Sequence, residues 1–182
     1  MNPVMSDSGP AAARVQRDAL VSLVTNIARA MQSEIPPGEI AALRRLPPGL
    51  PDSPAFWKIT GLFLDPAGVL PGDSRDRDDA ERRWGTILQA MATLKGLHVY
   101  GRRLGHVLAE SEISEMRFLR LLRSSGERLA QELRAVVHYV GSKALATDLS
   151  DVARLILSDG GKDGEAVRRG FARDFYSRFE QS

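Results

Sequence analysis

Apolar residues recur at intervals of three and four along most of this chain. The two clearest stripes run from Leu20 to Met31 and from Trp84 to Leu97. This spacing places one apolar face along a helix, whereas a half-buried strand would alternate every second residue. No strand-length segment alternates in that way, and no Asn-Gly or Asp-Gly turn joins two β-branched runs. We therefore predict an all-α fold of eight or nine helices without a sheet.

Prolines and small polar residues mark the ends of these helices. A long first helix is predicted from Ala11 to Pro36-Pro37, and Ser53-Pro54 supplies a cap and a first-turn proline for a helix that carries Phe56 and Trp57. Both aromatic residues are expected in the core. The charged run at residues 73–79 is predicted to be a mobile loop, followed by a helix from about Ala80.

The length of 182 residues suits one domain, or two small subdomains that share a core. We predict a flexible tail at residues 1–10, an N-terminal helical bundle at residues 11–100 and a C-terminal helical bundle at residues 101–182. The two bundles are expected to pack together as one compact helical protein.

The segment Gly101 to Arg134 combines apolar and basic residues on one helical pattern. Phe118, Leu121 and Leu122 share a face that can be buried, and the arginines lie off it. A guanidinium group matches phosphate geometry with two parallel hydrogen bonds, so such a face suits nucleic acid. The candidate contacts in this segment are Arg102, Arg103, Arg117, Arg120, Arg123 and Arg134, with His106 as a further possibility. The alternative is a solvated face whose arginines pair with the nearby glutamates.

The charge distribution slightly favours the second half of the chain for such a contact. The formal net charge is only +2, but residues 91–182 hold 15 basic and 12 acidic residues, against 10 and 11 in residues 1–90. The absence of cysteine excludes disulfides, thiolate catalysis and cysteine-bound zinc, and suits a reducing cytoplasm. We expect neither a signal peptide nor a membrane span.

Catalytic chemistry has no obvious candidate residues. The three histidines, His98, His106 and His138, do not form a metal-binding pair or a triad pattern. Gly160-Gly161-Lys162 lacks the upstream glycine and the following Ser or Thr of a phosphate-binding loop. We therefore predict a binding protein and not an enzyme, with no cofactor and no metal; a small hydrolase is the weakest of the alternatives.

Five short motifs, in order along the chain, resemble the CasB family, the small subunit of the type I-E CRISPR Cascade surveillance complex. Together they cover roughly residues 11–180. They are Glu39-Ile40-Ala41-Ala42-Leu43-Arg44-Arg45, Pro54-Ala55-Phe56-Trp57, Leu104-Gly105-His106-Val107-Leu108-Ala109, Ser114-Glu115-Met116-Arg117-Phe118-Leu119-Arg120-Leu121-Leu122 and Phe171-Ala172-Arg173-Asp174-Phe175-Tyr176.

The resemblance implies a cytoplasmic all-helical protein with two bundles and no catalytic activity. Its implied partners are the crRNA, the target DNA including the displaced single strand, the large and backbone subunits of Cascade, and a second copy of the chain. By position in the motifs, Arg44, Arg45 and Arg117 correspond to nucleic-acid contacts, and Lys58 lies where a basic residue is expected. Phe171 stands where many relatives have tryptophan.

Two functions from different classes follow from these observations. The first is a Cascade subunit that binds crRNA and target DNA and stabilises the R-loop through an arginine surface. The second is a stand-alone helical interaction or regulatory module whose arginines form only a solvated face. The first requires nucleic-acid binding that depends on these arginines, and the second does not.

Overall fold

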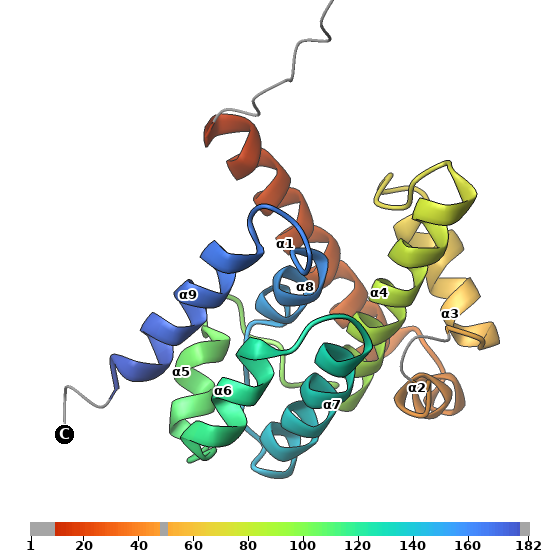
Figure 1. The fold of residues 1–182 in the computed structure, drawn as a ribbon. Coiled ribbons are helices and arrows are strands. Elements are labelled where there is room, and N and C mark those ends of the chain that lie inside the picture. The colour runs from red at the N-terminus through yellow and green to blue at the C-terminus, as the bar shows by residue number, and fades with distance from the viewer. Residues whose placement is uncertain (1–9, 48–50, 179–182) are drawn as a thin grey trace, which may run out of the picture.

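The computed structural model describes residues 10–47 and 51–178, and it is all-α over these ranges, as predicted (Figure 1). The described residues form nine α-helices and no β-strand; one isolated bridge joins His98 to Thr147. The helices are α1 (Pro10–Ser33), α2 (Pro37–Arg44), α3 (Pro54–Ile59), α4 (Ser74–Thr93), α5 (Leu104–Glu110), α6 (Glu115–Arg123), α7 (Gly126–Ser142), α8 (Leu149–Leu157) and α9 (Gly164–Tyr176). None of these helices combines the length and apolar character that crossing a membrane requires.

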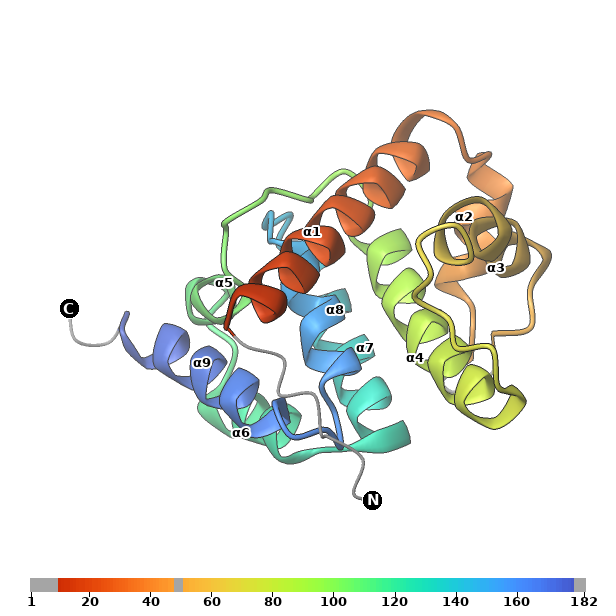
Figure 2. The ribbon, with the colours of Figure 1, turned by 90° about the horizontal axis from the view of Figure 1, so that it is seen from above.

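Helix α8 lies at the centre of the fold. It contacts α1, α4, α5 and α9, which surround it when the molecule is seen from above (Figure 2). Its buried residues are Leu149, Ser150, Asp151, Val152, Ala153, Leu155 and Ile156. A helix buried around most of its circumference must satisfy its polar groups internally, so the buried Asp151 and the buried Asp148 that caps the helix have structural partners, described below.

Buried residues from both halves of the sequence form one continuous hydrophobic core. Trp84 on α4 is 1% exposed, and Phe118 on α6 is fully buried and stacked on Phe175 of α9 at a ring-centroid distance of 3.9 Å. Helix α4 also contacts α2 and α7, so it joins the N-terminal helices to the C-terminal ones. The proposed division into two bundles near residue 100 stays a prediction.

In the charged run at residues 73–79, Asp73 caps α4 and the residues from Ser74 onward are helical, so the prediction of a mobile loop was wrong. Asp73 caps α4 by accepting a hydrogen bond from the Arg75 amide at 3.0 Å. One turn further on, Arg77 pairs with Glu81 at 2.8 Å, and Asp79 pairs with Arg83 at 2.7 Å. These i,i+4 pairs and the acidic first turn stabilise helix where composition alone suggested loop.

Helix α3 departs from the prediction in two ways. It begins as expected, because the Ser53 side chain accepts a hydrogen bond from the Ala55 amide and Pro54 is the first helical residue. After Ile59, however, it continues as a single π-helical segment, Thr60–Leu64. Phe56 is fully buried, but Trp57 is 48% exposed, so the expectation that both aromatics lie in the core was wrong for Trp57.

Gly105 brings the backbones of α5 and α9 into close approach. A Cβ atom at Gly105 would lie 2.6 Å from Asp174 Cβ and 2.7 Å from the Phe171 carbonyl oxygen. Real Cβ contacts are not this short, so a larger residue would force α5 away from α9.

Candidate nucleic-acid interface

The nine predicted contact residues lie on or beside five helices. Arg44 and Arg45 are at the end of α2, Lys58 is on α3, Arg102 and Arg103 precede α5, Arg117, Arg120 and Arg123 are on α6, and Arg134 is on α7. The structure brings most of them into three separate groups. These are a group on α6, a group where α2 meets α4 and α7, and a pair before α5.

Helix α6 presents its three arginines because its other face is buried. Ser114 caps the helix by accepting a hydrogen bond from the Arg117 amide at 3.4 Å. The burial of Phe118 and Leu121 then turns the basic positions outward, as the apolar spacing predicted.

The three α6 arginines differ in their partners. The Arg117 guanidinium lies 5.9 Å from the ring centroid of Tyr139, and Arg123 is exposed. Neither arginine forms an ion pair within the described part of the chain. Arg120, by contrast, forms an ion pair with Glu132 on α7, with 3.1 Å between Nε and Oε2. Two of the three cations on α6 are therefore available to an anionic ligand.

A groove of about 480 Å³ runs between the end of α6 and the start of α7. It is lined by Met116, Leu119, Arg120, Arg123, Ser124, Ser125 and Arg128. Met116 is 79% exposed, so the groove offers apolar surface beside its cations. This combination can accept phosphates on the guanidinium groups and planar apolar groups on the side chains between them.

Arg128 was missed by the sequence reasoning. It is exposed, forms no ion pair with another described residue, and lines the same groove as Arg123. Ser125-Gly126 separates the two arginines in sequence, so no helical period connects them. The signal that could have found Arg128 is the short turn itself, since two helices joined by two residues must have their ends close together.

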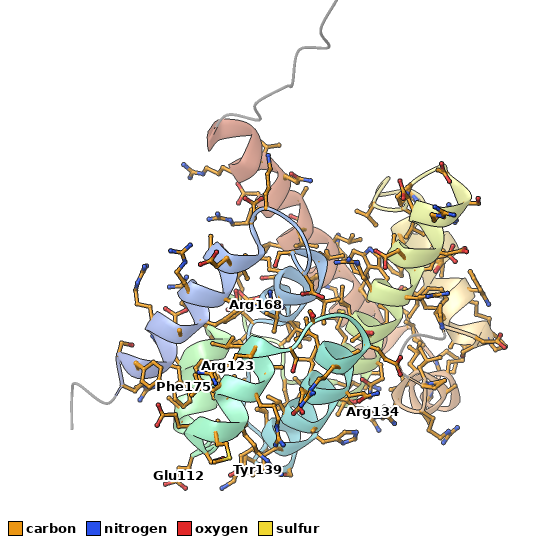
Figure 3. The ribbon with its side chains drawn as sticks, in the orientation of Figure 1. Glu112, Arg123, Arg134, Tyr139, Arg168 and Phe175 are labelled. Carbon is orange, nitrogen blue, oxygen red and sulfur yellow. The ribbon has the colours of Figure 1, made fainter. Side chains whose placement is uncertain are left out.

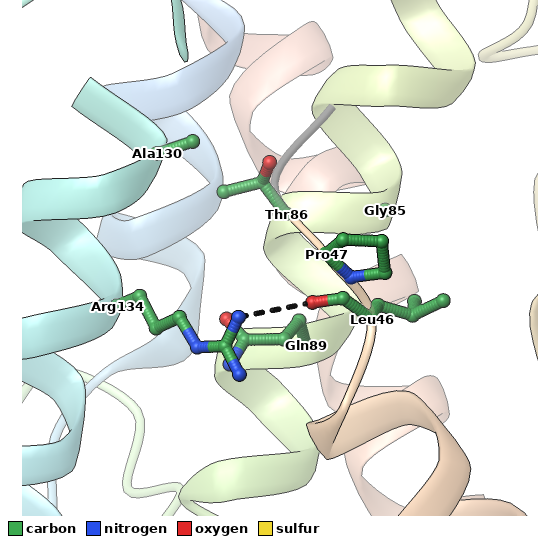
Figure 4. A pocket seen from close by; sticks show the side chains of 7 residues that line it. All are labelled: Leu46, Pro47, Gly85, Thr86, Gln89, Ala130 and Arg134. Atoms are coloured by element: carbon green, nitrogen blue, oxygen red, sulfur yellow. Dashed lines mark hydrogen bonds between the residues drawn. The ribbon is translucent and has the colours of Figure 1, made fainter. Parts of the chain in front are cut away.

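The second group surrounds the end of α2, where two arginines bind backbone carbonyl groups. Arg44 donates from Nε to the Ala92 carbonyl at 2.7 Å. Arg134 donates from Nη1 to the Leu46 carbonyl at 3.3 Å, as Figure 4 shows. The slot beside Arg134 has a volume of about 10 Å³, which is too small for a nucleotide. Arg44 and Arg134 therefore join α2 to α4 and α7. Arg44 and Arg45 are both exposed, and Arg45 is the member of this group whose side chain has no partner among the described residues.

The pair before α5 is held by carboxylates. Arg102 donates from Nη2 to both carboxylate oxygens of Glu110, at 2.9 and 2.8 Å, and Arg103 donates to Asp174 at 3.0 Å. His106 Nε2 lies 3.9 Å from the same Asp174 oxygen. Lys58, outside the three groups, pairs with Glu39. These four predicted contacts are engaged within the protein.

Two aspartates of α8 position the chain at the start of α5. Asp148 accepts a hydrogen bond from the Gly101 amide at 2.8 Å, and Asp151 accepts one from the Leu104 amide at 3.0 Å. Burial raises the pKa of the Asp151 carboxyl above its ordinary value, although the Leu104 amide and the nearby Arg154 lower it. Asp151 is thus a structural acceptor and not a surface acid.

Arg168 fixes the turn between α6 and α7. Its Nη2 donates to the Ser124 carbonyl and to Asp159 Oδ1, both at 2.7 Å, and the other Asp159 oxygen accepts from the Gly126 amide at 2.7 Å. Arg168 and Arg123 are labelled in Figure 3. Gly126 has φ of 57°, a left-handed conformation that favours glycine. The end of the groove is therefore built on a turn that is held at both ends by hydrogen bonds.

The groups on α6 and α2 are connected by α7, which lies between α6 and α2 in Figure 1. Helix α7 packs on α6 and on α4, and its Arg134 reaches Leu46 just beyond α2. The predicted residues thus do not form one unbroken positive track. Within the described ranges, no group of three or more His, Asp or Glu side chains is placed to hold a metal ion.

Comparisons with known proteins give one family and two solved structures of similar fold. A family model for CRISPR-associated protein Cse2 matches residues 39–176. A chain in the crystal structure of E. coli Cascade bound to a PAM-containing dsDNA target is 24% identical, with a TM-score of 0.66, and the match covers 87% of this chain and 97% of that one. CasB from Thermobifida fusca is 23% identical, with a TM-score of 0.66 and coverage of 88% and 97%. A search of curated proteins finds no match.

Proposed function

Because the chain belongs to the CRISPR-associated protein Cse2 family, we propose that it is the non-catalytic small subunit of a type I-E Cascade complex. In this role it binds the crRNA and the target DNA, including the displaced strand, and stabilises the R-loop. Its protein partners are the large and backbone subunits and a second copy of itself. The fold shared with a chain of DNA-bound E. coli Cascade and with CasB supports this proposal.

The observation that carries the proposal is a set of exposed arginines without carboxylate partners in the described part of the chain. Those of the candidate surface are Arg45 beyond α2, Arg117 and Arg123 on α6, and Arg128 on α7. Three of the four lie on the adjacent helices α6 and α7, whereas other exposed arginines of this kind, such as Arg17, Arg75 and Arg82, lie on α1 and α4. Twenty-three acidic residues are available in the chain. Cations left unpaired on a surface so rich in carboxylates are suited to an external anion.

The proposed mechanism is electrostatic. Arginines that meet phosphates displace condensed counterions, so affinity falls as salt concentration rises and depends little on sequence. Sequence recognition is left to base pairing between the guide and the target. This subunit then needs only to hold the sugar-phosphate backbone and unpaired nucleotides, for which the groove between α6 and α7 is suited.

The second candidate is a stand-alone interaction module. Trp57, which is 48% exposed, and Leu62, which is 68% exposed, lie on α3 and the π-helical segment that follows it, and they offer apolar surface to a protein partner. In that case the unpaired arginines would only keep the surface hydrated. The two functions differ in whether removal of these arginines changes nucleic-acid binding.

A charge-matched pair of triple variants tests the proposal. The first changes Arg45, Arg117 and Arg123 to alanine; the second changes Arg17, Arg75 and Arg82, three exposed arginines on α1 and the first half of α4. Binding of a labelled oligothymidylate is measured by fluorescence anisotropy over a range of salt concentrations. Each lost phosphate contact reduces affinity about fivefold at about 0.1 M salt, so the first variant is expected to bind about 100-fold more weakly.

The salt dependence gives an independent readout in the same experiment. For the first variant, the slope of log affinity against log salt should be shallower by about 2, since a single-stranded contact contributes about 0.7. The second variant should keep the slope of the unmodified protein. If both variants bind equally well, or the unmodified protein does not bind, the stand-alone module is the better explanation. Co-purification with crRNA and the other Cascade subunits tests the assembly.

A further inference from the structure

One carboxylate pairs with an arginine that lines the groove between α6 and α7. Glu132 on α7 forms an ion pair with Arg120 at 3.1 Å, and its own side chain is only 19% exposed, whereas that of Arg120 is 48% exposed. Arg120 lines the groove together with Arg123 and Arg128. Arg128 lies one turn before Glu132 on α7, and it forms no ion pair with any other described residue. Glu132 is thus a carboxylate that pairs with one of the arginines lining this groove.

The other engaged arginines are held in a different way. Asp174 is 7% exposed at the close approach of α5 and α9, so Arg103 satisfies a carboxylate that is already buried. Glu110 accepts two hydrogen bonds from Arg102 and lies 3.8 Å from Arg178 as well. Arg120 forms a single ion-pair contact with Glu132, and its side chain remains half exposed at the groove. Of these pairs, it is the one that an incoming phosphate can open most easily.

We propose that Glu132 is an internal competitor for the phosphate backbone at Arg120. In the free protein the Glu132 carboxylate occupies the position that a phosphate takes on binding. When a strand enters the groove, Arg120 exchanges Glu132 for a phosphate oxygen, and Glu132 is left as a negative charge beside the ligand. This inference rests on the proposed function, because it concerns the nucleic-acid ligand of the same surface.

Two consequences distinguish this arrangement from an ion pair with a purely structural role. Glu132 reduces the number of phosphates that the groove neutralises, so its removal should strengthen binding. The gain should appear as an additional counterion released, because Arg120 becomes free to neutralise one more phosphate. A structural ion pair between partly exposed side chains would instead affect stability slightly and leave binding unchanged or weaker.

The test compares Glu132→Gln with Glu127→Gln in the full chain. Each variant removes one negative charge from α7 with a side chain of the same shape. Glu127 is exposed and accepts only from Gln131 at 3.2 Å, so it engages no arginine. Binding of a labelled oligothymidylate is measured across salt concentrations, and the unfolding midpoint of each variant is measured in parallel.

Glu132→Gln is expected to bind about fivefold more tightly at about 0.1 M salt, with a salt slope steeper by about 0.7. Glu127→Gln should keep the slope of the unmodified protein. Adding Arg120→Ala to Glu132→Gln should cancel the gain.

Several results would overturn the inference. An unchanged slope for Glu132→Gln, or an equal gain for both glutamine variants, would refute competition even if the unmodified protein binds DNA as proposed. Loss of folding in Glu132→Gln, shown by a greatly lowered unfolding midpoint, would show that the ion pair serves the stability of the fold and not competition with a ligand. Absence of binding by every protein in the series would refute the proposed function and this inference together.

Discussion

Replacement of Gly105 by alanine tests the closest helix contact in the molecule. The added Cβ atom would lie 2.6 Å from Asp174 Cβ and 2.7 Å from the Phe171 carbonyl oxygen. Neither atom belongs to the flexible end of a side chain, so relief requires a shift of α5 relative to α9. We therefore expect Gly105→Ala to destabilise the protein.

Two opposing effects set the magnitude of this change. Alanine gains about 1 kcal/mol over glycine in a helix, because it restricts the unfolded chain and favours helical backbone. Overpacking of a close contact costs about 1–3 kcal/mol, and more when backbone must move. Since two contacts here are well below normal separation, the steric cost should exceed the helical gain. Because backbone must move here, the steric cost should reach about 3 kcal/mol, and subtracting the helical gain of about 1 kcal/mol leaves an expected net loss in the free energy of unfolding of about 2 kcal/mol.

Gly170 on α9 provides the matched control. Nothing lies within 4 Å of a Cβ atom built at Gly170, so the same substitution adds no contact there. Gly170→Ala should therefore stabilise the protein by about 0.5–1 kcal/mol. Urea denaturation followed by circular dichroism measures both changes. Opposite signs are expected for the two variants; a Gly105→Ala protein as stable as Gly170→Ala would show that α5 and α9 do not approach as described.

Three further changes test the core, a buried acid and the turn beside the groove. Phe118→Ala should lower the free energy of unfolding by about 3–5 kcal/mol in urea denaturation, because the ring is fully buried; a loss below about 1 kcal/mol would contradict its place in the core. Burial raises the pKa of Asp151, so the protonated carboxyl stabilises the folded protein relative to the unfolded one. This contribution is complete below the ordinary pKa of an aspartate, about 4, and is lost as pH rises through the raised pKa. Asp151→Asn can still accept from the Leu104 amide but does not titrate, so its stability relative to the unmodified protein should increase as pH rises above about 4; a difference that does not change with pH would refute this. Arg168→Ala should cost about 2 kcal/mol in thermal or urea unfolding, because it leaves Asp159 without its charged donor; an unchanged midpoint would contradict the bonded turn.

Most of the fold follows from local features of the sequence. The apolar spacing and the cap at Ser53 predict helices that the structure contains. The resemblance to the CasB family, based on short ordered motifs, is confirmed by the family match over residues 39–176. The run at residues 73–79 was mispredicted because its i,i+4 ion pairs outweigh its loop-like composition.

The state of each arginine was less predictable than its position. Arg117 and Arg120 are three residues apart on α6, yet only Arg120 has a carboxylate partner, and that partner comes from α7. Sequence spacing along one helix carries no information about which side chain a second helix brings opposite. For the same reason Arg44 and Arg134 could not be recognised as donors to the carbonyl groups of Ala92 and Leu46.

The turn that joins α6 to α7 also has a consequence for the energetics of association. Only Ser124 and Ser125 separate the two helices, and both ends of this turn are bonded through Asp159, to Arg168 and to the Gly126 amide. The conformational entropy of this segment is therefore lost when the protein folds and does not have to be lost again when a ligand arrives. A preorganised hairpin of this kind should bind with a small entropic penalty, and its Gly126 amide should exchange hydrogen slowly even in the unbound protein.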